Sequence, residues 1–250
     1  MNDNDLLRYS RQILLPQIDV RGQERLMAAR FLVVGAGGLG SPAAMYLAAA
    51  GIGQLVIADH DKVELSNLQR QLLHHDKDLG RPKVDSARDS LVAINPQLRV
   101  TALHTRLAGE QLAHEVSAAD VVVDCSDNFS TRFAINAACV AHRTALVSGA
   151  AVRFEGQLSA FDARDDNSPC YACLYRAGEE ADQTCAENGV LAPVVGAIGT
   201  LQALEAIKLH LGLGTSLVGR LVLFDGLAHE WRTLKLPRDP ACPVCSKRPG

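Results

Sequence analysis

The stretch Arg30-Phe-Leu-Val-Val-Gly35-Ala-Gly37-Gly38-Leu-Gly40-Ser41-Pro42 decides the fold class of this chain. Its short, uninterrupted apolar run is typical of a strand that is buried on both faces of a parallel sheet. Ser41 and Pro42 suit the N-cap and the first turn of a helix that ends at Gly51. The glycines between them allow a tight turn and let backbone N–H groups approach a phosphate. We therefore predict a strand, a glycine loop and a helix that together bind a nucleotide.

A carboxylate completes this nucleotide-binding pattern. Asp59 ends the next apolar run, 19 residues beyond Gly40, where an acidic side chain can bind ribose hydroxyls. The alternative, a glycine-rich turn that binds nothing, accounts for the glycines but not for the order of strand, glycines, helix and acid. That order favours nucleotide binding.

Strand and helix patterns alternate through the first 150 residues, which predicts a Rossmann-like, mostly parallel α/β sheet with helices on both faces. After residue 149 the apolar residues alternate with period two, so we expect antiparallel strands to extend the sheet. We expect one domain over residues 1–250, with a nucleotide-binding half of about 1–150 and a second half of about 151–250. Strands are expected at 30–35, 54–59, 99–104, 120–125, 144–149, 156–161, 217–225 and 230–236, and helices at 41–51, 82–94, 130–142 and 193–211.

Composition excludes several classes of protein. A formal net charge of −3 offers no electrostatic attraction to nucleic acid or to anionic membranes. The polar N-terminus lacks the apolar core of a signal peptide, and Gly, Pro or charge interrupts the apolar stretches before they reach the roughly 20 residues of a membrane span. We expect a cytoplasmic protein with no membrane or nucleic-acid partner.

Cations follow the second predicted strand. Ser66-Asn67-Leu68-Gln69-Arg70 comes directly after it, and Lys83 opens the next helix. Hydride transfer needs no such group of cations, whereas attack on the α-phosphate of ATP builds charge that Arg, Lys and Mg²⁺ stabilise. Isolated cations usually lie on a solvated surface, but these two flank the glycine loop. Arg70 and Lys83 are therefore predicted to face phosphates.

Two carboxylates stand near the end of the strand at 120–125. Asp127 follows the strand, on the side where open α/β sheets bind ligands, and it suits Mg²⁺. Asp124 lies within the strand and is expected to cap or pack. The alternative for Asp127 is that it caps the helix that begins near Ser130.

Four of the seven cysteines form two C-x-x-C pairs, Cys170/Cys173 and Cys242/Cys245. In a chain without an export signal, such pairs indicate a metal site before disulfides. Four thiolates would complete a closed, structural zinc site that fastens the C-terminal tail to the body of the fold. A thioredoxin-like redox pair is the alternative, but neither pair has the βαβ context. Cys125 and Cys139 lie in apolar runs and are expected in the core.

These segments together carry a resemblance to a known family. GAGGLG, ADHD, SNLQR-Q, GRPKVDSA, INP, DCSDN, SGA, PCYAC and CPVC occur in the order found in the MoeB/ThiF/HesA adenylyltransferases, which are bacterial relatives of ubiquitin-activating enzymes. The likeness runs from Arg8 to Cys245. It is closest to the molybdopterin branch, and the thiamine branch is the nearest sibling.

The resemblance implies a reaction. ATP and Mg²⁺ would activate the C-terminal glycine of a small ubiquitin-like sulfur carrier, one with a Gly-Gly end, as an acyl-adenylate with release of pyrophosphate. The carrier would then receive sulfur as a thiocarboxylate for molybdenum cofactor synthesis. No sulfur-donating, rhodanese-like extension follows Cys245, so we expect a separate sulfur donor.

The resemblance also implies roles for single residues. Asp59 would bind the ribose, Arg70 and Lys83 the phosphates, and Asp127 the Mg²⁺, while Arg11 would reach the ATP of the partner subunit in a homodimer. The four cysteines of the C-x-x-C pairs match the structural zinc site of the family. The implied ATP-binding residues are Gly35, Gly37, Gly38, Gly40, Asp59, Ser66, Asn67, Leu68, Gln69, Arg70, Lys83, Asp127 and Asn128.

Some alternatives stay open. Cys185 lies where relatives carry a thiol that forms a thioester or persulfide, but the acidic residues before it should raise its pKa, and an exposed Cys without catalytic duty is an equal interpretation. For the whole chain the alternatives are the thiamine-branch carrier, an NAD-dependent oxidoreductase, and a zinc-stabilised binding scaffold without catalysis. The carrier-binding surface is not located beyond the segment at 152–154 and the Cys185 loop.

Overall fold

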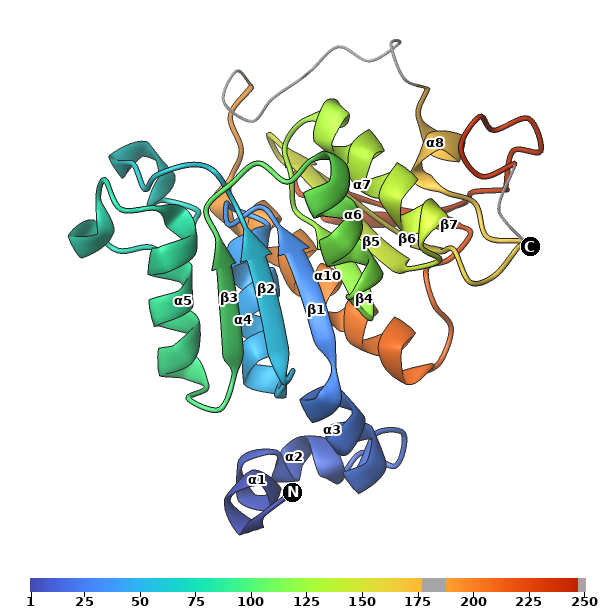
Figure 1. Cartoon of the computed structure of the whole chain (residues 1–250). Helices are drawn as coiled ribbons and strands as arrows, with labels where there is room; N and C mark the ends of the chain where they lie inside the picture. The colour runs from blue at the N-terminus through green and yellow to red at the C-terminus, as the bar shows by residue number, and fades with distance from the viewer. Residues whose placement is uncertain (177–187, 247–250) are drawn as a thin grey trace.

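The computed structural model describes residues 1–176 and 188–246, and Figure 1 shows its central sheet between helices on both faces. Within these residues the sheet has eight strands in the order β3-β2-β1-β4-β5-β6-β7-β8. Neighbours from β3 to β5 pair in parallel, and those from β5 to β8 pair antiparallel. This confirms the predicted fold class. The strands are β1 (Arg30–Val34), β2 (Gln54–Ala58), β3 (Arg99–Leu103), β4 (Val121–Asp124), β5 (Ala145–Val152), β6 (Glu155–Asp162), β7 (Arg220–Asp225) and β8 (Glu230–Lys235).

The helices cover the sheet in two layers with separate apolar cores. Side chains of α4, α5 and α10 pack on one face, and those of α6, α7 and α8 pack on the other. Short 3-10 turns occupy Leu65–Asn67 and Asp76–Asp78. The described helices are α1 (Asp3–Arg8), α2 (Ser10–Ile13), α3 (Asp19–Ala28), α4 (Gly40–Ala50), α5 (Lys83–Ile94), α6 (Gly109–Ser117), α7 (Phe129–Ala141), α8 (Tyr171–Leu174) and α10 (Ala192–Leu211).

The strand order reverses between β1 and β4, and this reversal positions the site. The chain leaves β1 toward β2 on one side, while β4 and β5 lie on the other. At the carboxyl ends, Val34 of β1 pairs with Asp124 of β4. Open α/β sheets bind ligands in the crevice at such a switch point. The loops after Val34 and Asp124 therefore face the same space.

Helix α10 is long and apolar enough to be compared with a membrane-spanning helix. It is 20 residues long with a mean hydropathy of 1.2 over an 18-residue window, and it is the one helix in the described ranges that is long and apolar enough to cross a membrane. As expected, Pro, Gly and charged residues interrupt its apolar sequence, among them Gly196, Glu205 and Lys208. Half of the window is buried, and the helix packs against α4 and strands β4, β5 and β6. It is therefore a core helix of this sheet.

Other boundaries also differ from the expected ones. Helix α4 begins at Gly40 with Leu39 at its N-cap, so Ser41 is not the cap; its hydroxyl is buried and has no hydrogen bond within the described chain. Strand β5 continues to Val152, beyond the expected end at 149, because its whole length pairs with β6. Helices α1, α2, α3, α6 and α8 were not predicted at all.

Candidate functional site

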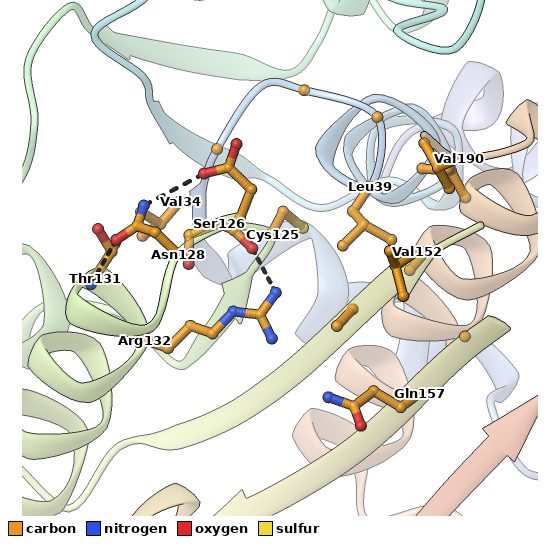
Figure 2. A pocket seen from close by; sticks show the side chains of 18 of the residues that line it. Val34, Leu39, Cys125, Ser126, Asn128, Thr131, Arg132, Val152, Gln157 and Val190 are labelled. Atoms are coloured by element: carbon orange, nitrogen blue, oxygen red, sulfur yellow. Dashed lines mark hydrogen bonds between the residues drawn. The ribbon is translucent and has the colours of Figure 1, made fainter. Parts of the chain in front are cut away.

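A pocket of about 610 Å³ lies at the carboxyl ends of the parallel strands and continues over β5, β6 and β7. One half is lined by the ends of β1, β2 and β4. Figure 2 shows Val34 and Ser126 in this half and Val152 and Gln157 in the other half, on β5 and β6. The pocket brings together these predicted site residues: Gly35, Gly37, Gly38, Asp59, Arg70, Lys83, Asp127 and Asn128.

The glycine loop has the tight backbone that the sequence predicted. Gly35 has φ of +101°, and a Cβ there would lie 2.6 Å from the carbonyl oxygen of Cys125. A Cβ on Gly40 would lie 1.9 Å from the carbonyl oxygen of Gly35. No side chain fits at either position. The loop therefore turns directly into the N-terminus of α4, where free N–H groups and the helix dipole favour an anion.

Asp59 and His74 fix the backbone of this loop by hydrogen bonds to Ala36. The Asp59 carboxylate accepts hydrogen bonds from the backbone N–H groups of Ala36 at 2.8 Å and Asp61 at 2.8 Å. His74 is buried; its Nε2 lies 2.9 Å from the carbonyl oxygen of Ala36, and its Nδ1 lies 2.9 Å from the Ser86 hydroxyl. Because a carbonyl only accepts, Nε2 carries the proton and Nδ1 accepts from Ser86. Burial lowers the pKa of His74, which keeps the ring neutral.

The two predicted cations enter the pocket from the neighbouring segments. Lys83 is buried, and its Nζ donates to Asp61 at 2.9 Å. Burial raises the pKa of Asp61, but the hydrogen bond and charge of Lys83 outweigh this and lower it. Arg70 donates from Nη1 to the carbonyl oxygen of Ser66 at 2.9 Å, which orients the guanidinium. Both cations therefore have fixed positions beside the glycine loop.

The rest of the Ser66–Arg70 segment supports Arg70 and does not line the pocket. The Asn67 side chain accepts from the backbone N–H of Glu64 at 3.2 Å and closes the 3-10 turn. Leu68 is half-buried and Gln69 is exposed. The family resemblance implies nucleotide contacts for four residues of this segment. In the structure they form the turn that positions Arg70; they are Ser66, Asn67, Leu68 and Gln69.

Asp127 has a free carboxylate because another residue caps α7. The Asn128 side chain accepts from the backbone N–H of Thr131 at 2.9 Å and from the Ser130 hydroxyl at 2.8 Å (Figure 2). Asp127 is exposed in the pocket, and within residues 1–176 and 188–246 its carboxylate accepts one hydrogen bond, from the Asn128 amide at 3.3 Å. Asp124, in contrast, is fully buried and accepts from Ser126 and Ser148. Of the two, Asp127 is the carboxylate open to a cation.

A buried amide in the same pocket fits a nucleotide. The Oε1 atom of Gln71 is buried and has no hydrogen-bond partner within the described residues, and its amide group lies next to Gly37. A buried polar atom without a partner costs free energy, which a donor on a bound ligand removes. Ribose hydroxyls and an adenine amino group are such donors. This unsatisfied acceptor beside the glycine loop supports a nucleotide in the pocket.

The four C-x-x-C thiols gather into one cluster. Their sulfur atoms lie within 4.8 Å of one another, with Sγ–Sγ distances of 3.6 Å between Cys170 and Cys242 and 3.5 Å between Cys173 and Cys245. A tetrahedron with bonds of ~2.3 Å places its sulfurs about 3.8 Å apart, so the cluster fits zinc. A hydrogen bond from Cys170 and backbone N–H groups lower the pKa of Cys173. Thiolate is the form that binds metal.

The cysteine cluster attaches the C-terminal tail to α7, as the sequence predicted. Asn136 on α7 donates to the Cys170 sulfur at 3.6 Å and accepts from the Tyr171 N–H at 2.8 Å. Cys242 and Cys245 are completely buried, and Cys139 is on the buried face of α7 in the core. Cys125 is buried as well but lines the pocket, which the sequence did not indicate.

Arg11 and Cys185 are the predicted site residues that remain. Arg11 is exposed on α2, at the opposite end of the molecule from the carboxyl ends of the strands (Figure 1), and it does not line the pocket of its own chain. Cys185 falls in 177–187, outside the described residues.

The structure adds residues that sequence reasoning missed. Arg132 on α7, Gln157 on β6 and Tyr175 after α8 all line the pocket, and the Tyr175 hydroxyl donates to Gln157 at 2.8 Å. Arg132 is the one charged residue of α7 and lies on its buried face, and this was the signal that could have found one of them. Gln157 and Tyr175 carried no such signal.

A Rossmann-like sheet with a glycine loop, a pocket at its switch point and a four-cysteine cluster defines a class of nucleotide-binding protein. Residues 9–244 match the ThiF family, and the chain belongs to that family.

Relatives cover nearly the full chain. It is 51% identical over 245 residues to the sulfur carrier protein ThiS adenylyltransferase of Escherichia coli, which covers 98% of this chain and 97% of that relative. It is 48% identical over 247 residues to the molybdopterin-synthase adenylyltransferase of Escherichia coli, with 99% of each covered. A solved structure of Escherichia coli MccB with ATP shares the fold, with a TM-score of 0.82 at 23% identity, covering 96% of this chain and 75% of that one.

Proposed function

We propose that this protein adenylates the C-terminal glycine of a ubiquitin-like sulfur carrier, with ATP as the second substrate. The observation that carries the proposal is one continuous pocket with two halves. The half at the glycine loop holds Asp59, Arg70 and Lys83. The lining of the half over β5 and β6 includes the small residues Ala150, Ala151 and Gly156, among larger ones such as Val152 and Phe224. A nucleotide suits the first half, and an extended tail that ends in two glycines suits the second.

The residues support attack on the α-phosphate. One carboxylate oxygen of the carrier forms a bond to the α-phosphorus, the bond from that phosphorus to the bridging oxygen breaks, and pyrophosphate leaves with the electron pair. Asp59 would hold the ribose through lone pairs that its backbone bonds leave open. Arg70 and Lys83 would stabilise the charge on the phosphates, and Lys83 would exchange its bond to Asp61 for one to the nucleotide.

We propose that two metals serve this protein in different ways. Asp127 would bind Mg²⁺ with the ATP phosphates, and bound Mg²⁺ supplies positive charge to the leaving pyrophosphate. The four-cysteine cluster would bind zinc as a closed structural site, since all four thiolates are used.

We propose a homodimer in which Arg11 of one subunit reaches the pocket of the other. Arg11 is remote from its own pocket and exposed, so any catalytic role requires a second chain. Leu7 and Leu14, on and beside the same short helices, are 76% and 71% exposed, which is typical of a surface that another chain covers. We further expect a separate sulfur donor and a cytoplasmic location.

Two carriers are candidates. The molybdopterin-branch carrier is our first choice, from the likeness of the motifs. The 51% identity to the ThiS adenylyltransferase favours the thiamine-branch carrier as the second candidate.

ATP–pyrophosphate exchange tests the proposal. Exchange should require Mg²⁺ and a carrier with an intact Gly-Gly end, and each of the two carriers is assayed separately. Exchange with the molybdopterin carrier alone assigns the branch, and exchange with both indicates a shared activator. If neither carrier supports exchange in zinc-loaded protein, adenylation is the wrong reaction, and nucleotide binding should be rescreened with NAD.

A further inference from the structure

Arg132 is a cation buried inside the pocket. It extends from the first turns of α7, and only 7% of the residue is exposed. Figure 2 shows its guanidinium below Ser126, on the side of the pocket that faces Gln157. Arg132 therefore stands where the two halves of the pocket meet, between the end of β4 and strand β6.

The charge of Asp124 and the neighbouring Tyr171 stabilise this guanidinium, but no described carboxylate forms a direct ion pair with it. Nη2 donates to the carbonyl oxygen of Ser126 at 2.7 Å. Among the ion pairs of residues 1–176 and 188–246, none within 4.0 Å includes Arg132. Arginine is seldom buried unless it is paired, because a buried charge without a counterion is costly. An arginine of this kind in a pocket wall indicates a bound anion.

The nearby carboxylate does not fill that role. Asp124 lies close enough to raise the pKa of Arg132 against the effect of burial. However, Asp124 Oδ1 accepts from Ser126, and its Oδ2 accepts from the Ser148 hydroxyl at 3.0 Å. Asp124 thus lowers the cost of burying the cation while Arg132 keeps donors directed into the pocket.

The position of Arg132 in the pocket favours a carboxylate over a phosphate as its bound anion. Arg70, Lys83 and the N-terminus of α4 already surround the phosphate end of the pocket. Arg132 lies below Ser126 on the side of Gln157 (Figure 2), and Gln157 is joined to Tyr175 by a 2.8 Å hydrogen bond. A carrier tail that lies over β5 and β6 would bring its terminal carboxylate to this junction. A planar guanidinium suits a carboxylate well.

We propose that Arg132 binds the terminal carboxylate of the protein substrate and holds it beside the nucleotide before adenylation. This inference rests on the proposed function. Arg132 binds one carboxylate oxygen while the other forms the bond to phosphorus, and it transfers no proton because a guanidinium stays charged. The carboxylate loses its charge when the acyl-adenylate forms. Arg132 therefore stabilises the bound substrate more than the product, so its loss should raise KM for the carrier more than it lowers kcat.

The direct test compares two forms of the carrier on the wild-type dimer. One form ends in the natural carboxylate and the other in a carboxamide, and binding is measured by calorimetry with an ATP analogue whose α and β phosphorus atoms are joined by methylene. The carboxylate form should bind roughly 10- to 100-fold more tightly, as expected for a hydrogen bond to a charged group. Arg132→Gln should remove this preference, and Arg132→Lys should keep part of it. Affinity for the ATP analogue alone should be unchanged in both variants.

The controls separate the possible failures. Arg99→Gln removes an exposed arginine on β3 outside the pocket and should keep the full preference. Equal affinity of the wild type for both carrier forms overturns the role of Arg132, even if Arg132→Gln does not fold. A folded Arg132→Gln protein that keeps the preference overturns it too, and so does a variant that loses ATP-analogue affinity instead, since Arg132 would then bind phosphate. Pyrophosphate exchange by the wild type, measured alongside, reports on the proposed function separately.

Discussion

At the scale of single residues, the charged side chains of the pocket differ in their hydrogen-bond partners. Lys83 is buried and paired with Asp61, Arg70 is oriented by the Ser66 carbonyl, and Asp127 is left open because Asn128 caps α7. Each of these three residues follows a predicted strand or opens a predicted helix, which is why the local sequence was enough to find them. Arg132 lies inside α7 and has no such position, so its role depends on contacts that only the fold brings together.

Replacing Lys83 should remove charge stabilisation at the phosphates. Lys83→Met is expected to lower the rate of pyrophosphate exchange roughly 10²- to 10³-fold, the usual effect of losing one group that stabilises transition-state charge. Lys62→Met removes an exposed lysine outside the pocket and is the matched control, with exchange near the wild-type rate. Equal rates in the two variants would show that Lys83 does not face the reacting phosphates.

His74 should make stability depend on pH. Its pKa lies below the ordinary value of 6.5, first because of burial, so the folded protein resists a proton that the unfolded chain accepts. Stability is therefore lost as pH falls below about 6.5 toward the folded-state pKa, and His74 contributes no slope above that range. Urea unfolding at about pH 5.5 and 7.5 should show a smaller loss on acidification in His74→Gln than in the wild type. His210, whose pKa burial also lowers, is present in both proteins and contributes equally to both. An identical loss of unfolding free energy on acidification in His74→Gln and the wild type would contradict this account.

At the scale of elements, local patterns predicted the core strands and the long helices because burial there is continuous. Strands β1, β2 and β4 are nearly pure apolar runs, and α10 follows Pro193 at its start. Helices α1 to α3 were missed because distant contacts stabilise them. Gln12, for example, donates to Gln23 at 2.8 Å and to the Ala50 carbonyl oxygen at 3.0 Å. No local pattern in a short polar segment reports such partners.

The cysteine cluster should stabilise the elements on its side of the sheet. Cys242→Ser is expected to reduce bound zinc below one ion per chain and to lower Tm by roughly 5 °C or more, since the tail and α8 lose a shared anchor. Cys139→Ala, a buried cysteine outside the cluster, should keep its zinc. Metal analysis with thermal unfolding measures both. A Cys242→Ser protein with full zinc content would show that the cluster is not the metal site.

At the scale of the whole molecule, one sheet brings together the two halves of the pocket and the cysteine cluster, whose residues lie far apart in the sequence. Its parallel half carries the part of the pocket that we propose binds the nucleotide, its antiparallel half carries the part that we propose binds the carrier tail, and the cysteine cluster lies against α7. The sequence predicted a parallel first half, antiparallel strands after it and a cysteine cluster that includes the C-terminal tail. The residues that face each other across the pocket could not be predicted, because they depend on how β5 to β7 pack over the crevice.

The dimer proposal gives a test by mixing. Arg11→Ala and Lys83→Ala should each be inactive alone, but a mixed dimer contains one pocket with both wild-type residues. Random exchange of subunits should therefore restore about one quarter of wild-type pyrophosphate exchange. An active Arg11→Ala protein, or a mixture that stays inactive after proven subunit exchange, would show that Arg11 does not act across subunits.

The central claim is that a carrier carboxylate becomes joined to AMP in this pocket, and intact-mass measurement of the carrier tests it most directly. The carrier is incubated with the protein, ATP and Mg²⁺, without a sulfur donor, and a carrier that lacks its last glycine serves as the control. The account predicts that the intact carrier alone gains the mass of one AMP, with an equal amount of pyrophosphate released. Pyrophosphate release without AMP on the carrier, or AMP on the truncated carrier as well, would contradict it.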